Sequence, residues 1–504
     1  RAMRIMKSQR PILLLVDNRT RDAHGILLVY NWLRSMGCRV VLCNKRNWKA
    51  RWRAVKPSVV VLSYTDGAGM EELLSQVAKV SRIALIPEEG AIPDRDFVVL
   101  ERYTGIRKEV GAFTKGISKV FLWGPQTAQW LLEAGVFTPE QIVVSGSPRF
   151  DPYLALTHNG TRLWGDDHTS RAIGFATGFE KLNVYHRNNF LQLVDERRNI
   201  QENEYYDAGK NIEDYVWFQT ACMRTVLDII EQFAASSNLM YIRPSPYEMV
   251  EGYTFLKEKY PHLIVSNSLL VWEWLTRLSC LVTFNSTTGI EALLIGVPVI
   301  SPLKLLGSRL HDHMNLPTYV NPPFLRFYWQ PETLSEAIDM LKGAKAGQLA
   351  VSPQMEGFTE YVKAFYDWPR PEPSSLTIAR ELAQLAEIDT AEKRNDSMPV
   401  LSRHTEGSYV EGVPRSLQDL YRRIGRWLPP IFLDLGYVAF DLLNGNSRSM
   451  QRYHFYSWHR QDFQKAKQVW TALQQVEQRA LSEKVQQEEV RGDPSVVKQR
   501  AKGE

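Results

Sequence analysis

The sequence predicts an α/β chain built from two Rossmann-like domains with a helical C-terminal extension. Strand-like apolar runs alternate with helical stretches in the first half, and this alternation restarts after a polar stretch at 157–170 and ends near residue 389. Such alternation is typical of a doubly wound parallel sheet. A chain of 504 residues is also too long for one hydrophobic core. We therefore expect domains over 1–160 and 161–390, followed by a tail over 391–504.

The first domain should contain six strands. Helices are expected at 26–36, which Gly37 ends, and at 69–79. The polar residues 157–170 are expected to form a linker. Apolar runs bounded by turn residues mark the strands, and they cover 12–16, 40–43, 59–63, 83–86, 120–122 and 142–144.

The second domain should repeat this pattern. Expected strands cover 173–176, 239–242, 263–265, 281–284 and 297–300, and expected helices cover 212–234, 247–259, 270–278 and 290–295. Ligands of parallel α/β sheets bind beyond the carboxyl ends of the strands, and two such domains should have a cleft between them. We therefore look for functional residues in the loops that follow strands.

Composition excludes several classes of protein. The chain is 44% hydrophobic and 23% charged, with a formal net charge of +5, which does not by itself indicate nucleic-acid binding. Four scattered cysteines form neither a disulfide framework nor a zinc motif, so a cytoplasmic setting is expected. There is no apolar run of about 18 residues and no signal-peptide pattern, so no membrane span is expected.

The polar cluster 285–289 (NSTTG) is the most informative segment, because it stands between an expected strand and an expected helix. Small hydroxyl residues at a helix start present backbone N–H groups and the positive end of the helix dipole, which suits a phosphate. Glu291, one turn into the helix, could accept hydrogen bonds from ribose hydroxyls. The same pattern also fits a hydroxyl-rich helix cap with a purely structural role.

Two adjacent carboxylates, Glu88 and Glu89, follow the strand at 83–86 and precede Gly90. Their mutual repulsion is expected to raise the pKa of one of them, which suits general acid or base catalysis. A solvated acidic turn is the alternative.

Two proline-containing loops complete the set. Residues 243–248 (RPSPYE) form a turn that two prolines stiffen, in which Arg243 could bind a phosphate or carboxylate. Residues 145–151 (SGSPRFD) lie at the expected domain junction. Residues 243–248 are interpreted equally well as the rigid start of a helix. Residues 145–151 are interpreted equally well as an ordinary turn.

The order of these motifs resembles a family of bacterial GT-B glycosyltransferases that use CMP-activated ulosonic or nonulosonic acids. Bacterial sialyltransferases and the β-Kdo transferases of capsule and O-antigen synthesis share an acidic motif, an HP motif and a serine/threonine motif. The chain is most similar to surface carbohydrate biosynthesis proteins related to the Kdo transferases. EEG, RPSPYE and STTG occur here in that order, and Trp123-Gly124 with GSPRFD precedes the linker. The resemblance covers about residues 10–390.

The resemblance implies a role for each matching residue. Glu89, with Glu88 beside it, would be the base toward an acceptor hydroxyl or the nucleophile of a retaining enzyme. The first loop, 17–22 (DNRTRD), also looks like that of the family. Residues of the acceptor side or the cleft would be Asp17, Arg19, Arg21 and Arg149. Nucleotide-binding residues would be Arg243, Ser245, Glu248, Ser286, Thr287, Thr288 and Glu291.

No cofactor or metal ion is expected, because helix dipoles and cationic side chains can stabilise a departing CMP, which belongs to the donor substrate. His311-Asp312-His313, the one His-x-His sequence, is interpreted as a polar loop. One position departs from the family pattern, since Ser245 stands where the relatives have a histidine. Serine donates a hydrogen bond but carries no charge at neutral pH. A different donor, a substitute such as Arg243 or His186, or lost activity would each explain this difference.

The tail contains seven arginines and nine aromatic residues between 415 and 460. Basic segments with interfacial aromatic residues suit an anionic membrane surface, although packing against the catalytic core or a partner fits as well. Residues 464–487 are expected to form a charged, solvent-exposed helix that could self-associate. The sequence thus predicts a peripheral glycosyltransferase of surface polysaccharide synthesis, with a glycan or lipid-linked acceptor. A CDP-glycerol-type polyol-phosphate transferase and a catalytically silent GT-B scaffold are the alternatives.

Overall fold

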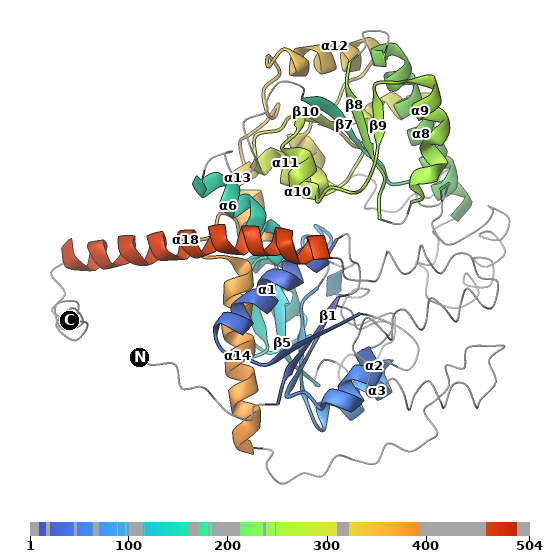
Figure 1. Ribbon diagram of the computed structural model, residues 1–504. Coiled ribbons are helices and arrows are strands. Elements are labelled where there is room, and N and C mark those ends of the chain that lie inside the picture. The colour runs from blue at the N-terminus through green and yellow to red at the C-terminus, as the bar shows by residue number, and fades with distance from the viewer. Residues whose placement is uncertain are drawn as a thin grey trace, which may run out of the picture. The chain divides into compact units, whose positions relative to one another are not determined.

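The structure is a computed structural model, shown in Figure 1, and it groups the chain into two compact units. Unit 1 comprises Arg1–Asp151 and Phe365–Glu504, and unit 2 comprises Pro152–Ala364. The residues that the structure describes are 10–16, 21–44, 48–63, 70–87, 89–95, 98–99, 114, 116–159, 171–179, 182–183, 212–234, 238–246, 248–309, 322–392 and 460–490.

Unit 1 contains a six-stranded sheet in which every pairing is parallel, in the order β2-β1-β3-β4-β5-β6. Buried aliphatic residues such as Leu13, Val60 and Val120 form its core. The strands are β1 (Ile12–Val16), β2 (Val40–Asn44), β3 (Val59–Leu62), β4 (Arg82–Leu85), β5 (Ile117–Leu122) and β6 (Ile142–Val144). The first helices along the chain are α1 (Ala23–Ser35), α2 (Trp48–Val55), α3 (Met70–Ala78), α5 (Pro125–Glu133) and the short η2 (Pro148–Phe150).

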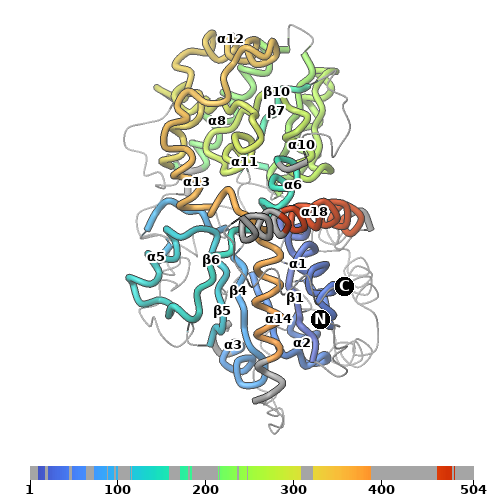
Figure 2. Tube along the Cα trace, turned by 90° about the vertical axis from the view of Figure 1, so that its left-hand side faces the viewer, coloured from blue at the N-terminus to red at the C-terminus, as the bar shows by residue number. Residues whose placement is uncertain are grey.

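Two helices from the far end of the chain complete unit 1. These are α14 (Ser374–Glu392) and α18 (Arg460–Val490), and both pack against α1 (Figure 2). Trp32 of α1 donates a hydrogen bond from its indole N–H to Ser375 Oγ at 3.1 Å, and its ring lies 5.7 Å from the ring of Trp470 in α18. The contacts therefore place residues 365–392 in unit 1, whereas the sequence assigns most of them to the second domain.

Unit 2 contains a five-stranded parallel sheet in the order β11-β10-β7-β8-β9. Its strands are β7 (Ala172–Ala176), β8 (Met240–Arg243), β9 (Leu263–Val265), β10 (Leu278–Val282) and β11 (Val299–Ile300). Its helical segments are α6 (Asp151–Asn159, which begins in unit 1), α8 (Ile212–Ala234), η4 (Val250–Tyr253), α9 (Thr254–Lys259), α10 (Val271–Leu275), α11 (Thr288–Leu294), η5 (Pro302–Arg309), η7 (Pro323–Phe327), α12 (Leu334–Lys345) and α13 (Phe358–Tyr366, which ends in unit 1).

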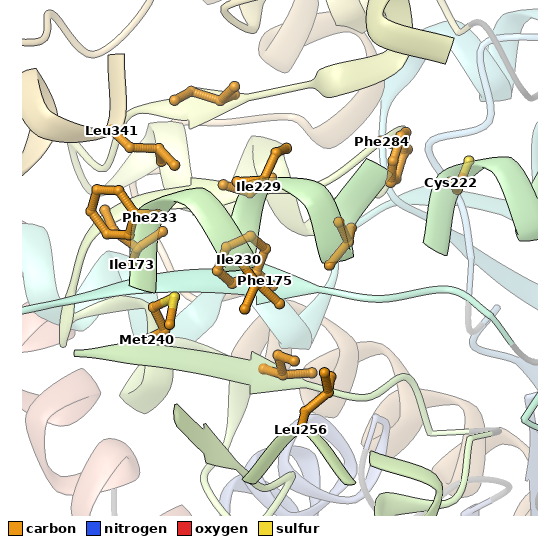
Figure 3. Packing of buried hydrophobic residues seen from close by; sticks show 14 of the residues in the cluster. Ile173, Phe175, Cys222, Ile229, Ile230, Phe233, Met240, Leu256, Phe284 and Leu341 are labelled. Carbon is orange, nitrogen blue, oxygen red and sulfur yellow. The ribbon is translucent and has the colours of Figure 1, made fainter. Parts of the chain in front are cut away.

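The long helix α8 supplies one side of the unit 2 core (Figure 3). Ile229, Ile230 and Phe233 are at most 1% exposed and pack in one cluster with Phe175 of β7 and Met240 of β8. This burial explains why an apolar face at helical spacing predicts α8 with the correct bounds. The predicted fold class, two Rossmann-like parallel sheets with a helical C-terminal extension, is confirmed.

Several element boundaries differ from the prediction. The helix expected at 247–259 is instead a 3₁₀ turn followed by α9, and the helix expected to reach 278 ends at Leu275, so that β10 begins at Leu278. Residues 157–159, expected in a linker, belong to α6, and 160–170 lie outside the described residues. No expected helix covers α2, α5, α6, α12, α13 or α14.

The C-terminal helix is not the fully solvent-exposed helix that the sequence predicts. α18 buries Ala466, Val469, Ala472, Leu473 and Val476, each at most 4% exposed. Their spacing puts them on one face of the helix, and this face packs on α1. The basic and aromatic segment up to residue 459 lies outside the described residues.

Candidate functional site

In unit 2, three loops follow neighbouring strands at the point where the strand order reverses. β7 is the first strand of this sheet, β8 and β9 extend it to one side, and β10 and β11 extend it to the other. All pairings are parallel, so the carboxyl ends of these strands share one edge of the sheet. The loops that begin at Thr177, Pro244 and Thr283 therefore lie at the topological switch point, where open α/β sheets bind ligands.

The serine/threonine motif stands at the start of α11, as the sequence predicts. Ser286 Oγ accepts a hydrogen bond from the Thr288 backbone N–H at 3.2 Å. Because a hydroxyl that accepts one hydrogen bond still has a proton to donate, this contact orients Ser286 as a donor. Thr287 is exposed and Thr288 is half-buried, so both border the solvent side of the loop.

Two buried tyrosines hold the first turns of α11. Tyr153 of α6 donates its hydroxyl hydrogen bond to Glu291 Oε2 at 2.5 Å. Tyr328 donates to the Ser286 carbonyl at 3.1 Å, and its ring leaves room only for a glycine at 289, since a Cβ there would lie 2.3 Å from the Tyr328 hydroxyl. Burial raises the pKa of Tyr328 well above its usual value, which keeps it a donor. Glu291 is 1% exposed.

Glu248 of the RPSPYE turn is completely buried and ties the turn to β7. Its carboxylate accepts hydrogen bonds from the Ser245 backbone N–H at 3.0 Å, from the Thr177 hydroxyl at 3.0 Å and from the Tyr253 hydroxyl. Burial raises the pKa of Glu248, and the hydrogen bonds that its charged form accepts oppose this shift. In the structure Glu248 thus positions Ser245.

Arg243 ends β8 and lies against the next helix along the sheet. Its guanidinium donates to the Leu269 carbonyl at 2.6 Å and lies 5.7 Å above the ring of Trp274. The side chain is 8% exposed. Arg243 thus ends β8, and Ser245 and Glu248 lie in the loop that follows it. One strand, β7, separates β8 from β10, which leads to Ser286.

In unit 1, the acidic motif follows β4, and Glu89 is paired with a residue of the first loop. Arg21 Nη1 lies 3.1 Å from Glu89 Oε1, and the Glu89 side chain is 53% exposed. Arg21 also lies 3.1 Å from Asp22. Arg21 of the first loop and Glu89 of the acidic motif therefore form a direct ion pair, which the sequence did not predict, and the guanidinium orients a carboxylate that is open to solvent.

The turn that carries Glu89 is fixed by Trp123. The Trp123 indole N–H donates to the Pro87 carbonyl at 3.2 Å, and Thr127 donates to the Gly90 carbonyl at 3.1 Å. A Cβ at residue 90 would lie 2.4 Å from the Trp123 ring. The Trp123 indole thus requires a glycine at position 90.

The GSPRFD motif connects two distant parts of unit 1. Asp151 is buried and accepts hydrogen bonds from the backbone N–H groups of Ser374 and Ser375, both at 2.8 Å, at the start of α14. Burial raises the pKa of Asp151 to about 6. The Phe150 ring lies 5.1 Å from that of Tyr366. Arg149, expected in the acceptor site, is half-buried, and Ser147 Oγ accepts from its backbone N–H at 3.3 Å.

Other predicted residues lie outside the described part of the chain. They are Asp17, Arg19, Glu88, His186 and the His311–His313 sequence. Among the described residues, no group of three or more His, Cys, Asp or Glu side chains could hold a metal ion. No described helix is both long and apolar enough to cross a membrane.

Four positioning residues were not predicted: Tyr153, Thr177, Tyr253 and Tyr328. Each is buried and contacts a predicted residue that is distant in the sequence or separated from it by a turn. No local pattern distinguishes them from other core residues.

Comparisons with known proteins give structural likeness only. No protein-family model matches the sequence, and no match was found among curated proteins. The wall teichoic acid polymerase TagF is similar over 78% of this chain and 92% of its own, with 10% identity and a TM-score of 0.46. A UDP-GlcNAc 2-epimerase from Neisseria meningitidis, bound to UDP-GlcNAc, is similar over 75% of this chain and 99% of its own, with 10% identity and a TM-score of 0.39. A likeness of this degree says nothing about substrate.

Proposed function

We propose that the protein is a glycosyltransferase of surface polysaccharide synthesis that transfers a Kdo-like or other ulosonic or nonulosonic sugar from a CMP-activated donor. One observation carries the proposal. The STTG and RPSPYE loops follow β10 and β8, the two strands that flank the central strand β7 on opposite sides, near the switch point of the unit 2 sheet. That is where a parallel α/β sheet binds a phosphate-containing ligand. The order of these motifs after EEG resembles the CMP-sugar-dependent GT-B enzymes.

In the proposed reaction, the two units have different tasks. Ser286, Thr287 and Thr288 would bind the phosphate of CMP through hydroxyl and backbone donors as it leaves. The bond between the anomeric carbon and the phosphate oxygen breaks, and an acceptor oxygen bonds to that carbon. Glu89 would take the acceptor proton, or would form the covalent intermediate of a retaining reaction. Glu248 and Tyr153 would hold the two nucleotide loops in place.

The proposed setting is the cytoplasmic side of a cell membrane, with a glycan or lipid-linked acceptor. All four cysteines are free and buried, which is consistent with a reducing compartment. Residues 415–460 are proposed to contact anionic lipid.

Nucleotide binding tests the proposal directly. We expect CMP to bind in the presence of a chelator and more tightly than UDP or GDP, as measured by calorimetry. The double variant Ser286→Ala, Thr287→Ala should weaken CMP binding by about 1–3 kcal/mol, because two hydrogen bonds to a charged group are lost. Thr254→Ala with Thr276→Ala is the matched control, since both of these hydroxyls in unit 2 donate to carbonyls outside the site.

Different results would select the alternatives. A preference for UDP or GDP, or binding that disappears with chelator, would contradict the proposal. Transfer of a polyol phosphate from a CDP-linked donor would identify the CDP-glycerol-type reaction instead. Binding without transfer from any CMP- or CDP-linked donor would support the silent scaffold, which the serine at 245 favours.

A further inference from the structure

Positive charge is concentrated at the start of the chain. Residues 1–56 contain fourteen lysines and arginines and two aspartates, a formal charge of +12, whereas the whole chain carries +5. The remaining residues therefore sum to −7. The small net charge of the whole chain thus conceals a strongly basic N-terminal segment.

The sheet gathers part of this charge at one edge. Arg39 directly precedes β2, Lys56 lies three residues before β3, and Arg82 begins β4. The register pairs Ile12 with both Val40 and Val59, and Val59 with Arg82, so all these strands start at the same edge. Neighbouring strands lie about 4.8 Å apart. Arg10 reinforces the edge by donating to the Lys56 and Pro57 carbonyls at 3.0 and 2.7 Å.

Two neighbouring helices, α2 and α3 (Figure 2), add further cations. α2 exposes Lys49 and Arg53 and ends next to Lys56, and Lys79 is exposed after α3. We define the basic face as Arg39, Lys49, Arg53, Lys56 and Lys79.

The described residues around the basic face leave its positive charges uncompensated. All five side chains are exposed, and none forms an ion pair within the described part of the chain. One carboxylate, Glu387 of α14, lies near Cys38, where its charge adds to burial in raising the pKa of the thiol. Uncompensated charges of one sign on one face indicate an anionic partner.

The chemistry of the face favours a lipid headgroup surface over nucleic acid. Single-stranded nucleic acids are bound by aromatic side chains that stack on bases, but both tryptophans of α2, Trp48 and Trp52, are at most 1% exposed. The Trp52 indole also donates to Ser81 at 3.2 Å, inside the unit. The exposed side of α2 carries the cations Lys49 and Arg53, with the small residues Ala50 and Ala54 beside them. Such a surface attracts anionic headgroups through charge alone.

We propose that the basic face binds the anionic surface of a lipid bilayer. The proposal does not depend on the reaction catalysed, and it concerns a part of the chain separate from residues 415–460. Binding of this kind is electrostatic, so it should weaken steeply as salt is raised.

Vesicle co-sedimentation of the full chain tests this. The wild-type protein should bind vesicles that contain phosphatidylglycerol at low salt and should not bind vesicles of phosphatidylcholine alone. Each cation removed should weaken the partition constant about fivefold. The triple variant Lys49→Glu, Arg53→Glu, Lys56→Glu should therefore lose binding by at least about a hundredfold, and circular dichroism should show an unchanged fold.

The matched control is Lys257→Glu, Arg277→Glu, Lys363→Glu, which changes the net charge equally at exposed positions of unit 2. It should bind vesicles nearly as well as the wild type. Equal binding by both triple variants would overturn the proposal and leave bilayer contact to other residues. Tighter binding to a DNA duplex than to acidic vesicles at the same salt would overturn the choice of lipid as the partner.

Discussion

Glu89 is the side chain on which the proposed reaction depends most. It is exposed, and Arg21 orients it from the first loop. Glu89→Gln keeps the shape but removes the base or nucleophile, so turnover should fall by about 10²-fold or more. CMP affinity, proposed to reside in unit 2, should change little. Glu88→Gln is the control. Near-normal transfer by the Glu89 variant would refute the assignment, and a loss with Glu88→Gln alone would move it by one residue.

Asp151 should make the stability of unit 1 depend on pH. Its pKa is raised to about 6 by burial, above the ordinary value of 3.8. The contribution to stability is therefore complete below about pH 4 and is lost as the pH rises through 6, at up to about 1.4 kcal/mol per pH unit. Asp151→Asn, which does not titrate, should be less destabilised relative to the wild type at pH 7 than at pH 4.5. Thermal unfolding of both proteins at the two pH values measures this, and a penalty that grew with pH would contradict it.

Single residues also show how far the sequence predicts the candidate site. The predicted loops lie at the carboxyl ends of their strands, because strand periodicity and turn residues are local signals. The partners of these loops are not local. Gly90 is explained by Trp123, and Glu248 is held by Thr177, 71 residues earlier in the chain. Such contacts depend on tertiary packing, which one sequence does not reveal.

At the scale of elements, prediction succeeds where an apolar pattern is strong and fails where few residues are buried. β1, β6, β9 and α8 have the predicted bounds. α2 buries Trp48 and Trp52. Their spacing of four residues is a helical signal, but lysines and arginines surround them and obscure it. α18 was predicted as a helix, yet its narrow row of small residues did not indicate the surface against which it packs.

The packing of α18 on α1 should weaken in acid. His24 of α1 is buried beside Asp462 and Lys465 of α18, and burial lowers its pKa from 6.5 to about 4. Its contribution to stability is therefore present above pH 6.5 and is lost as the pH falls toward 4, at up to about 1.4 kcal/mol per pH unit. His24→Phe cannot titrate, so its stability relative to the wild type should rise between pH 7.5 and 5. Apparent melting temperatures of the two proteins measure this.

Between pH 4 and 6, the titration of Asp151 changes the stability of the protein in the opposite direction to that of His24. The effect of His24 is therefore obtained from the difference in stability between the His24 variant and the wild type, in which the effect of Asp151 cancels. Hydrogen exchange of the α18 amides at both pH values provides a second measurement. If the exchange of the wild type did not quicken in acid relative to the variant, His24 would not control this contact.

At the scale of the whole molecule, chain order and structural units do not coincide. Unit 1 closes only when α14 and α18, which follow unit 2 in the sequence, return to α1. Asp151 and Ser374 are in contact although 223 residues separate them. The alternation of strands and helices along the sequence predicts two sheets. It does not show which sheet a later helix packs on, because the apolar face of a helix can pack on either one.

This topology predicts how pieces of the chain behave. Residues 1–160, the domain expected from sequence, lack α14 and α18 and would leave the α1 side chains Leu28, Trp32 and Leu33, each at most 4% exposed, open to water. That piece should aggregate or bind a hydrophobic dye. Residues 152–364 should fold alone, with a cooperative melting transition and the CMP affinity of the full chain. Replacing 152–364 by a short Gly-Ser linker should restore a folded unit 1, because Phe150 and Tyr366 are already in ring contact. Circular dichroism melts of the three proteins decide this, and a stable, monomeric 1–160 piece would show that α14 and α18 are dispensable.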